Sequence, residues 1–224
     1  MNKKTMRVAM AVVIAAAGQH VMAEAPSYNY VQFDYVVSGD TQLKSSGLSS
    51  ESLDVEQGFA LQGAFEIGDY MLVMGRHHAL DYDDSDGTFL GVDNAVINDM
   101  TFIGVGAHLP IADMLDVYGA VGFSRPTYTN VAGEGYGLEV GARVNVEMIE
   151  AALWYNMGST DTKAGSQTVD IDPELLGLDV AISFAPQAPQ LVLGYVDATH
   201  ELKAGATDAD IEYDYFSIGV RKSF

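Results

Sequence analysis

Apolar and polar residues alternate with a period of two along most of the chain. In the clearest run, Gly135–Glu147, Tyr136, Leu138 and Val140 begin a series of apolar residues at every second position. Glycine and charged residues occupy the positions between them. Such alternation is typical of a β-strand with one apolar and one polar face. Glycine falls inside nearly every run, where it would weaken a helix. The pattern therefore predicts an all-β fold.

Ten runs of this kind predict ten strands. They are Tyr28–Val37, Val55–Ile67, Tyr70–Leu80, Asn98–Leu109, Leu115–Arg125, Gly135–Glu147, Ile149–Gly158, Glu174–Ala185, Gln190–Thr199 and Glu212–Phe224. Short, turn-like links alternate with long polar links: Ser38–Asp54, Asp81–Ile97, Pro126–Glu134, Ser159–Pro173 and His200–Ile211. This arrangement predicts a transmembrane antiparallel up-and-down β-barrel with short periplasmic turns and long extracellular loops. Eight strands is the alternative, if two of the runs form hairpins within loops.

The composition of the two faces indicates which one meets lipid. The polar faces are rich in glycine, alanine and serine, which suit a crowded lumen, whereas the other faces carry bulky aliphatic and aromatic residues. A barrel is the form of sheet that can cross lipid, because it leaves no strand edge with unpaired backbone groups. We therefore expect hydrocarbon outside the barrel and polar groups inside it.

The N-terminus has the pattern of an export signal. Lys3, Lys4 and Arg7 precede the apolar run Val8–Ala17, and Ala23 is the expected cleavage position. The run is shorter than the roughly 20 residues that a membrane-spanning helix needs. The interpretation is a signal peptide at residues 1–23, Sec-type export, and a barrel domain at residues 24–224 in the outer membrane of a Gram-negative bacterium.

The charge balance excludes several classes of function. The chain has 31 Asp and Glu against 11 Lys and Arg, a formal net charge of −20, and no basic patch. Such a chain is not expected to bind a nucleic-acid backbone. It has no Cys, which excludes disulfides, thiolate metal sites and thiol catalysis.

The last strand ends on an aromatic residue. Ser217, Gly219 and Phe224 resemble the C-terminal assembly signal of outer-membrane barrels, whereas Lys222 departs from the apolar residue expected there. A lysine at this position can extend its ammonium group to the membrane interface. The resemblance implies contact with the barrel-assembly machinery and periplasmic chaperones during biogenesis.

Three stretches carry a wider resemblance. SYNYVQFDY (Ser27–Tyr35), GVGAHLPIADMLDVYGAVGF (Gly104–Phe123) and GYGLEVGARV (Gly135–Val144) resemble small porin-like outer-membrane β-barrel proteins of Gammaproteobacteria. The group they resemble most is the diffusible-signal-regulated outer-membrane proteins, which share the general plan of the OmpA and OmpX transmembrane barrels. The resemblance implies the fold and brings no catalytic residues with it.

Several charged and amide residues are predicted to face the lumen. They are Gln62, Glu66, Arg76, Glu139, Arg143, Asn145, Asp179 and Arg221. Charges in a narrow lumen must be paired or hydrated. The favoured interpretation is a salt-bridge network that plugs the lumen, because a ten-stranded barrel is far narrower than a 16-stranded porin. The alternative is a selective pore. Arg76 and Trp154 fit awkwardly on either face.

Most of the acidic residues fall in the predicted loops or beside them. The ordinary interpretation is a solvated acidic surface. The alternative is weak binding of Ca²⁺ or Mg²⁺, for example by Asp81, Asp83, Asp84 and Asp86, with divalent bridging to lipopolysaccharide phosphates. DYDDSDG does not match an EF-hand when it is aligned on Gly87. No resident cofactor is expected.

No spacing motif supports an enzyme. His77, His78 and His200 fall near acidic residues, but acids are so numerous that this proximity is expected by chance. The predicted function is an envelope-structural or surface-interaction role. The first alternative is a small cation-preferring channel and the second an outer-membrane hydrolase. The expected partners are outer-membrane lipid and lipopolysaccharide, and the chain is expected to be a monomer.

Overall fold

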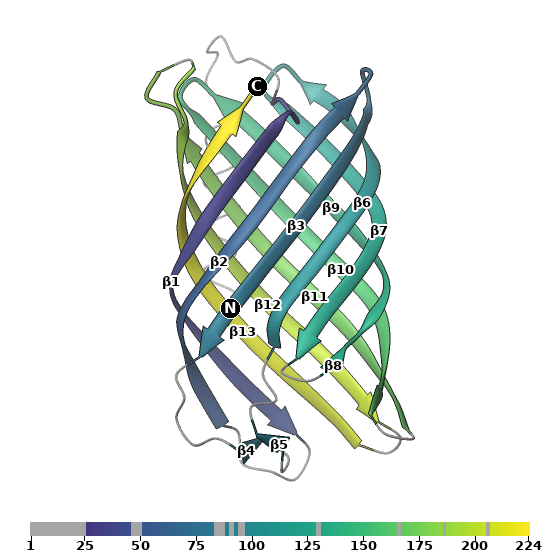
Figure 1. Cartoon of the computed structure of the whole chain (residues 1–224). Helices are drawn as coiled ribbons and strands as arrows, with labels where there is room; N and C mark the ends of the chain where they lie inside the picture. The colour runs from purple at the N-terminus through teal and green to yellow at the C-terminus, as the bar shows by residue number, and fades with distance from the viewer. Residues whose placement is uncertain are drawn as a thin grey trace.

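A closed barrel of ten long antiparallel strands forms the computed structural model shown in Figure 1. The structure describes residues 26–45, 51–82, 88–89, 92–93, 97–128, 131–164, 167–185, 187–204 and 207–224. The predicted signal peptide, its cleavage position and Asp83, Asp84 and Asp86 lie outside these residues. In these ranges no helical segment reaches the length and hydropathy that a membrane crossing requires.

Ten strands make up the barrel wall, and three short ones lie at its loops. The wall strands are β1 (Tyr30–Ser45), β2 (Glu51–Ile67), β3 (Met71–Tyr82), β6 (Ile97–Ala112), β7 (Leu115–Tyr128), β9 (Glu134–Val146), β10 (Ile149–Ala164), β11 (Gln167–Ile182), β12 (Gln190–Ala204) and β13 (Thr207–Ser223). The short strands are β4 (Thr88–Phe89), β5 (Val92–Asp93) and β8 (Val131–Ala132).

Each wall strand pairs with its neighbours in the chain, and the first and last pair with each other. Tyr30 on β1 lies opposite Ala64 on β2 and also opposite Ser223 on β13. The predicted ten-stranded up-and-down barrel is confirmed, and the eight-stranded alternative is wrong. We call the end of the barrel with the short links the turn end and the opposite end the loop end.

The strands extend farther toward the loop end than the alternation predicted. β10 and β11 include most of the predicted link Ser159–Pro173, and β12 and β13 include most of His200–Ile211. Most of the predicted link Ser38–Asp54 likewise lies on β1 and β2, so the prediction of long loops at these three places is wrong. Many of the acids assigned to loops lie instead on strands that continue the barrel wall.

The reason is that apolar residues change from the inward-facing to the outward-facing positions partway along a strand. On β13 the buried, inward-facing residues toward the loop end are Ala209, Ile211, Tyr213 and Tyr215. Beyond Tyr215–Phe216 the inward residues are Ser217, Gly219 and Arg221, and the outward residues are Phe216, Ile218 and Val220. On β11 the same reversal falls at Leu175–Leu176. A pattern that changes phase midway looks like the end of a strand when it is read for one phase only.

The outer face consequently has two zones. The apolar belt, nearer the turn end, consists of exposed large apolar residues: Val31, Phe33, Tyr35, Phe59, Leu61, Phe65, Ile67, Met71, Ile103, Val105, Leu109, Val121, Phe123, Leu138, Val140, Ile149, Leu193, Phe216, Ile218, Val220 and Phe224. The acidic zone, nearer the loop end, includes Asp40, Asp54, Asp81, Asp99, Glu134, Asp161, Glu174, Asp197, Glu212 and Asp214. The belt faces outward in the half of the barrel whose interior is polar.

Candidate functional site

Arg76 on β3 is the centre of the polar interior. Its Nη2 lies 3.0 Å from Oε1 of Glu139, and its Nη1 lies 3.8 Å from Oδ2 of Asp179. Nη1 also donates a hydrogen bond to Oε1 of Gln62. The guanidinium stacks 3.8 Å above the ring of Trp154, whose Nε1 donates to Asp179. Arg76, which was predicted to face the lumen although it fits awkwardly on either face, and Trp154 therefore both face the lumen and contact each other.

Glu139 on β9 balances the charge of Arg76. Its side chain is fully buried, and it accepts further hydrogen bonds from the hydroxyl of Tyr118 (2.9 Å) and from Nδ2 of Asn156 (3.3 Å). The charge is thus paired and hydrogen-bonded across four strands, which is the condition under which a buried carboxylate is tolerated. Asn156 and Tyr118 were not predicted as members of this network.

A second cluster lies nearer the turn end around Glu150. Its Oε1 accepts hydrogen bonds from Nη2 of Arg143 and Nη1 of Arg221, both at 2.5 Å. Arg221 also donates from Nε to Gln32 (2.7 Å). Both guanidinium groups stack on the ring of Tyr30. The predicted luminal residue Asn145 lies opposite Glu150 in the β9–β10 ladder.

A third cluster closes the turn end, and its histidine is not among the predicted site residues. Nδ1 of His108 lies 2.9 Å from Asp116, and its Nε2 lies 3.3 Å from the predicted luminal residue Glu66. The hydroxyl of Tyr28 donates to Asp116 (2.6 Å), and its ring packs 4.5 Å from that of His108. His108 and Asp116 alternate inward on the two strands of one hairpin, which is the signal that could have paired them.

The loop-end half of the lumen is filled mainly by apolar side chains. The buried cluster there includes Val36, Val55, Leu80, Met100, Phe102, Ile171, Leu175, Val196, Ile211, Tyr213 and Tyr215. His78 and His200 are buried within it, and both imidazoles approach the Tyr213 hydroxyl through Nε2, at 2.9 and 3.4 Å. Burial lowers the pKa of His200 to about 3, so the ring is neutral near pH 7. Neither histidine lies at an open rim.

Four aspartates form a row across four strands in the acidic zone. Asp40 on β1 lies opposite both Asp54 on β2 and Asp214 on β13, and Asp214 lies opposite Asp197 on β12. Partial burial and the charges of Asp40 and Asp197 raise the pKa of Asp214. Asp81, from the predicted cation loop, accepts a hydrogen bond from Gln57 (3.1 Å). In the described part of the chain no group of three or more His, Cys, Asp or Glu residues has the geometry of a metal site.

The predicted assembly-signal residues occupy the seam between the first and last strands. Ser217 and Gly219 face inward, and Phe224 lies exposed at the turn end of the belt. The backbone N–H of Phe224 donates to the carbonyl of Asn29 (3.0 Å), and its ring packs 5.5 Å from that of Phe65.

The fold is that of the outer-membrane β-barrels. The chain is similar to the outer-membrane protease OmpT from Escherichia coli, with a TM-score of 0.52 and 8% identity over 89% of this chain and 97% of that one. It also matches Neisserial surface protein A (15% identity, 88% and 98% covered, TM-score 0.39) and the attachment invasion locus protein Ail of Yersinia pestis (12%, 87% and 99%, TM-score 0.33).

At these identities the likeness extends to the fold alone. No protein-family model matches the chain, and no curated protein matches it. The resemblance to the diffusible-signal-regulated proteins therefore stays a prediction.

Proposed function

We propose that the protein is an integral outer-membrane β-barrel of a Gram-negative bacterium with a closed lumen, and that it acts in envelope structure or in surface interactions. The observation that carries this proposal is that the turn-end and loop-end halves of the barrel have opposite polarities inside and outside. Polar groups are inside where the outer face is apolar, and apolar groups are inside where the outer face is acidic.

The apolar belt supports insertion in a bilayer. On β13 the belt runs from Phe216 to Phe224. At about 3.3 Å per residue and a strand tilt of about 40°, this stretch is about 20 Å tall. That height approaches the roughly 25 Å of a lipid-facing band. A monomer exposing so much apolar surface to water would aggregate.

The packing of the lumen favours a plug over a channel. A permeating ion would first have to displace Arg76 and Trp154 from their contacts with Glu139 and Asp179. It would then have to pass an apolar layer that includes Phe102. Each barrier excludes hydrated ions, because removing an ion from water without a new partner costs several kcal/mol.

The same packing disfavours the hydrolase alternative. Of the three histidines named above, His77 faces outward, and its Nδ1 lies 2.9 Å from the Thr101 hydroxyl. His78 and His200 are each at most 1% exposed. A substrate outside the barrel cannot reach either imidazole. The acidic zone, in contrast, is exposed at the loop end on continuous strands, and this arrangement suits electrostatic interactions at the cell surface.

Planar-bilayer recording tests the closed lumen. Purified protein whose gel mobility shifts on heating, and which is therefore folded, should give no stepwise conductance in KCl. Steady cation-selective steps from such preparations would favour the channel alternative and overturn the proposal.

A deletion strain tests the envelope role. Loss of the protein should change detergent sensitivity or adhesion, and the wild-type gene should restore both. A variant with Asn at positions 40, 54, 197 and 214 separates the two roles. This variant should restore detergent resistance, and it should fail to restore adhesion if the acidic zone binds a partner.

We also propose that residues 1–23 direct export and that Ser217, Gly219 and Phe224 form the assembly signal. The seam position of Phe224 supports this, because the residue completes the contact between the chain ends. Phe224→Ala should lower the amount of folded barrel in cells while the purified variant still folds in detergent. Unchanged cellular assembly would refute the signal.

A further inference from the structure

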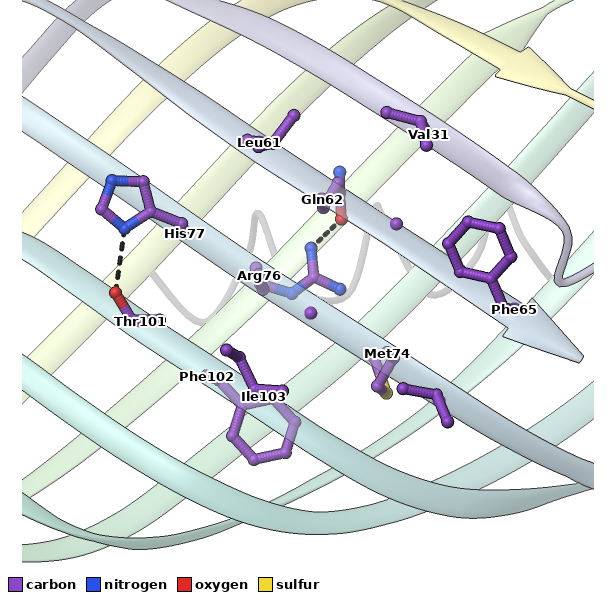
Figure 2. Close-up of a pocket in the computed structure, with 13 residues that line it drawn as sticks. Val31, Leu61, Gln62, Phe65, Met74, Arg76, His77, Thr101, Phe102 and Ile103 are labelled. Atoms are coloured by element: carbon purple, nitrogen blue, oxygen red, sulfur yellow. Dashed lines mark hydrogen bonds between the residues drawn. The ribbon is translucent and has the colours of Figure 1, made fainter.

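A groove on the outer face of the barrel lies over the paired strands β2 and β3 and is bordered by residues of β1 and β6. It has a volume of about 370 Å³, within the range of small-ligand sites. Its floor is formed by Gly63 and Gly75, which lie opposite each other and both face outward without a side chain. Outward side chains that border it are Val31, Leu61, Phe65, Val73, His77, Thr101 and Ile103. Figure 2 shows His77 and Thr101 at one end and Phe65 toward the other.

The end of the groove toward the loop end is polar. Nδ1 of His77 and the hydroxyl of Thr101 are 2.9 Å apart, an interaction drawn in Figure 2. Arg125 on β7 lies directly opposite Thr101, faces outward and is exposed. Asp99 and Glu134 are on the adjoining strands, yet within the described residues neither forms an ion pair with Arg125. A cation thus lies where the apolar belt meets the acidic zone.

We propose that the groove binds an acyl chain of lipid A, and that Arg125 binds the lipid's phosphate. The proposal rests on the membrane insertion proposed above. The apolar floor and walls fit a hydrocarbon chain, and the guanidinium fits a phosphate, which arginine binds in a bidentate manner. Nε2 of His77 is available to the sugar or ester oxygens between the two. The polar end faces the external leaflet, and this orientation selects lipid A over the phospholipids of the inner leaflet.

A second outward glycine supplies a matched control. A Cβ added at Gly75 would meet only the carbonyl oxygen of Phe102, at 3.8 Å, so the position has room for a side chain. A Cβ at Gly119 on β7 would meet only atoms 3.8 Å away, on Glu139 and Val140. Gly119 also faces outward but lies outside the groove. Gly75→Leu therefore fills the groove and Gly119→Leu does not, while the space available for the added side chain is similar at the two positions.

Native mass spectrometry of the folded barrel in detergent, with hexa-acylated lipid A or phosphatidylglycerol as probes, tests the proposal. Wild-type protein should retain lipid A in preference to phosphatidylglycerol. Gly75→Leu, with Gly75→Val as a second filling variant, should lose this retention, whereas Gly119→Leu should keep it. Arg125→Gln should weaken retention about fivefold, which corresponds to about 1 kcal/mol, and Lys163→Gln on β10 should have no effect.

Three results would overturn the proposal. They are equal retention of both lipids, equal loss in Gly119→Leu and Gly75→Leu, and undiminished binding by Arg125→Gln. Heat-modifiable migration and insertion into vesicles are measured on the same samples. A barrel that inserts without lipid preference refutes this inference alone, whereas a chain that does not insert refutes the proposed function.

Discussion

Replacing Glu139 by Ala tests whether the luminal ion pairs hold the barrel together. The carboxylate is fully buried and is bound by Arg76, Tyr118 and Asn156. Removing one partner of a buried ion pair costs about 3–5 kcal/mol, because the other charge is left without compensation. Arg76 keeps Asp179 at 3.8 Å and the face of Trp154. We therefore expect the low end of that range, about 3 kcal/mol.

The measurement can use the protein's own fluorescence. Trp154 is the only tryptophan in the chain and stacks on Arg76, so its emission reports the state of the network. In urea titrations of the barrel in lipid vesicles, a loss of about 3 kcal/mol should lower the unfolding midpoint by about 1–3 M. Glu134→Ala, an exposed change on the same strand, should stay within about 0.5 kcal/mol of wild type.

A double variant separates the lost pair from general packing damage. If the charges interact as described, Arg76→Leu combined with Glu139→Leu should cost less than the sum of the single changes by about 1–3 kcal/mol. Additive losses, or a cost below about 1 kcal/mol for Glu139→Ala, would refute the view that this pair is a main stabilising element of the lumen.

Three further changes have definite expected outcomes. Asp214→Asn should raise the unfolding free energy by several tenths of a kcal/mol at pH 7, because it removes a negative charge that lies directly opposite Asp40. The pKa of Asp214 is raised in the fold, so the wild-type carboxyl becomes protonated as the pH falls, and urea titrations should then show the gain vanish. The pKa of His200 is about 3 in the fold and about 6.5 in the unfolded chain, so the stability that the neutral, buried imidazole contributes is lost as the pH falls from about 6.5 to about 3. His200→Phe should therefore make the urea midpoint depend less on pH over that interval. Gly122→Ala should impair folding, because its Cβ would lie 2.0 Å from the carbonyl oxygen of Ile103, whereas Gly119→Ala should be tolerated; heat-shift gels of both variants check this.

The strand number and the facing of the belt could be predicted because they depend on local alternation. The run Gly135–Glu147 shows this, since its apolar residues lie on the outer face of β9, which spans Glu134–Val146. Each strand contributes its own period-two signal, and the even spacing of turns fixes the antiparallel order.

The loop-end extensions could not be predicted from alternation of constant phase. At Tyr215–Phe216 two aromatic residues follow each other, and the predicted strand Glu212–Phe224 extends only a few residues past this reversal, whereas β13 continues to Thr207. Asp210 falls in the predicted link His200–Ile211, although it lies on the continuous strand β13. Recognising the reversal requires knowing that water replaces lipid outside the wall at that level.

The partners inside the lumen depend on contacts across the barrel, which the sequence does not encode locally. Arg76 and Trp154 are 78 positions apart, and each looks misplaced when it is considered alone. Their stacking in the lumen explains both, because the indole face covers the guanidinium. His108 likewise carries no signal on its own, and its role depends on Asp116, which faces it from the other strand of the same hairpin.

The reversal of phase also fixes how deeply the barrel can be immersed. A displacement outward by two residues would lift Phe216 and Tyr195 into water, and a displacement inward would drag Asp214 and Asp197 into hydrocarbon, where a charged group costs up to about 3 kcal/mol. Because the same boundary recurs on strands around the circumference, the free-energy costs of such a displacement add over these strands. The barrel therefore has one preferred membrane–water boundary. The height by which the loop end projects from the bilayer is set by the residues of the strands rather than by the lengths of the loops.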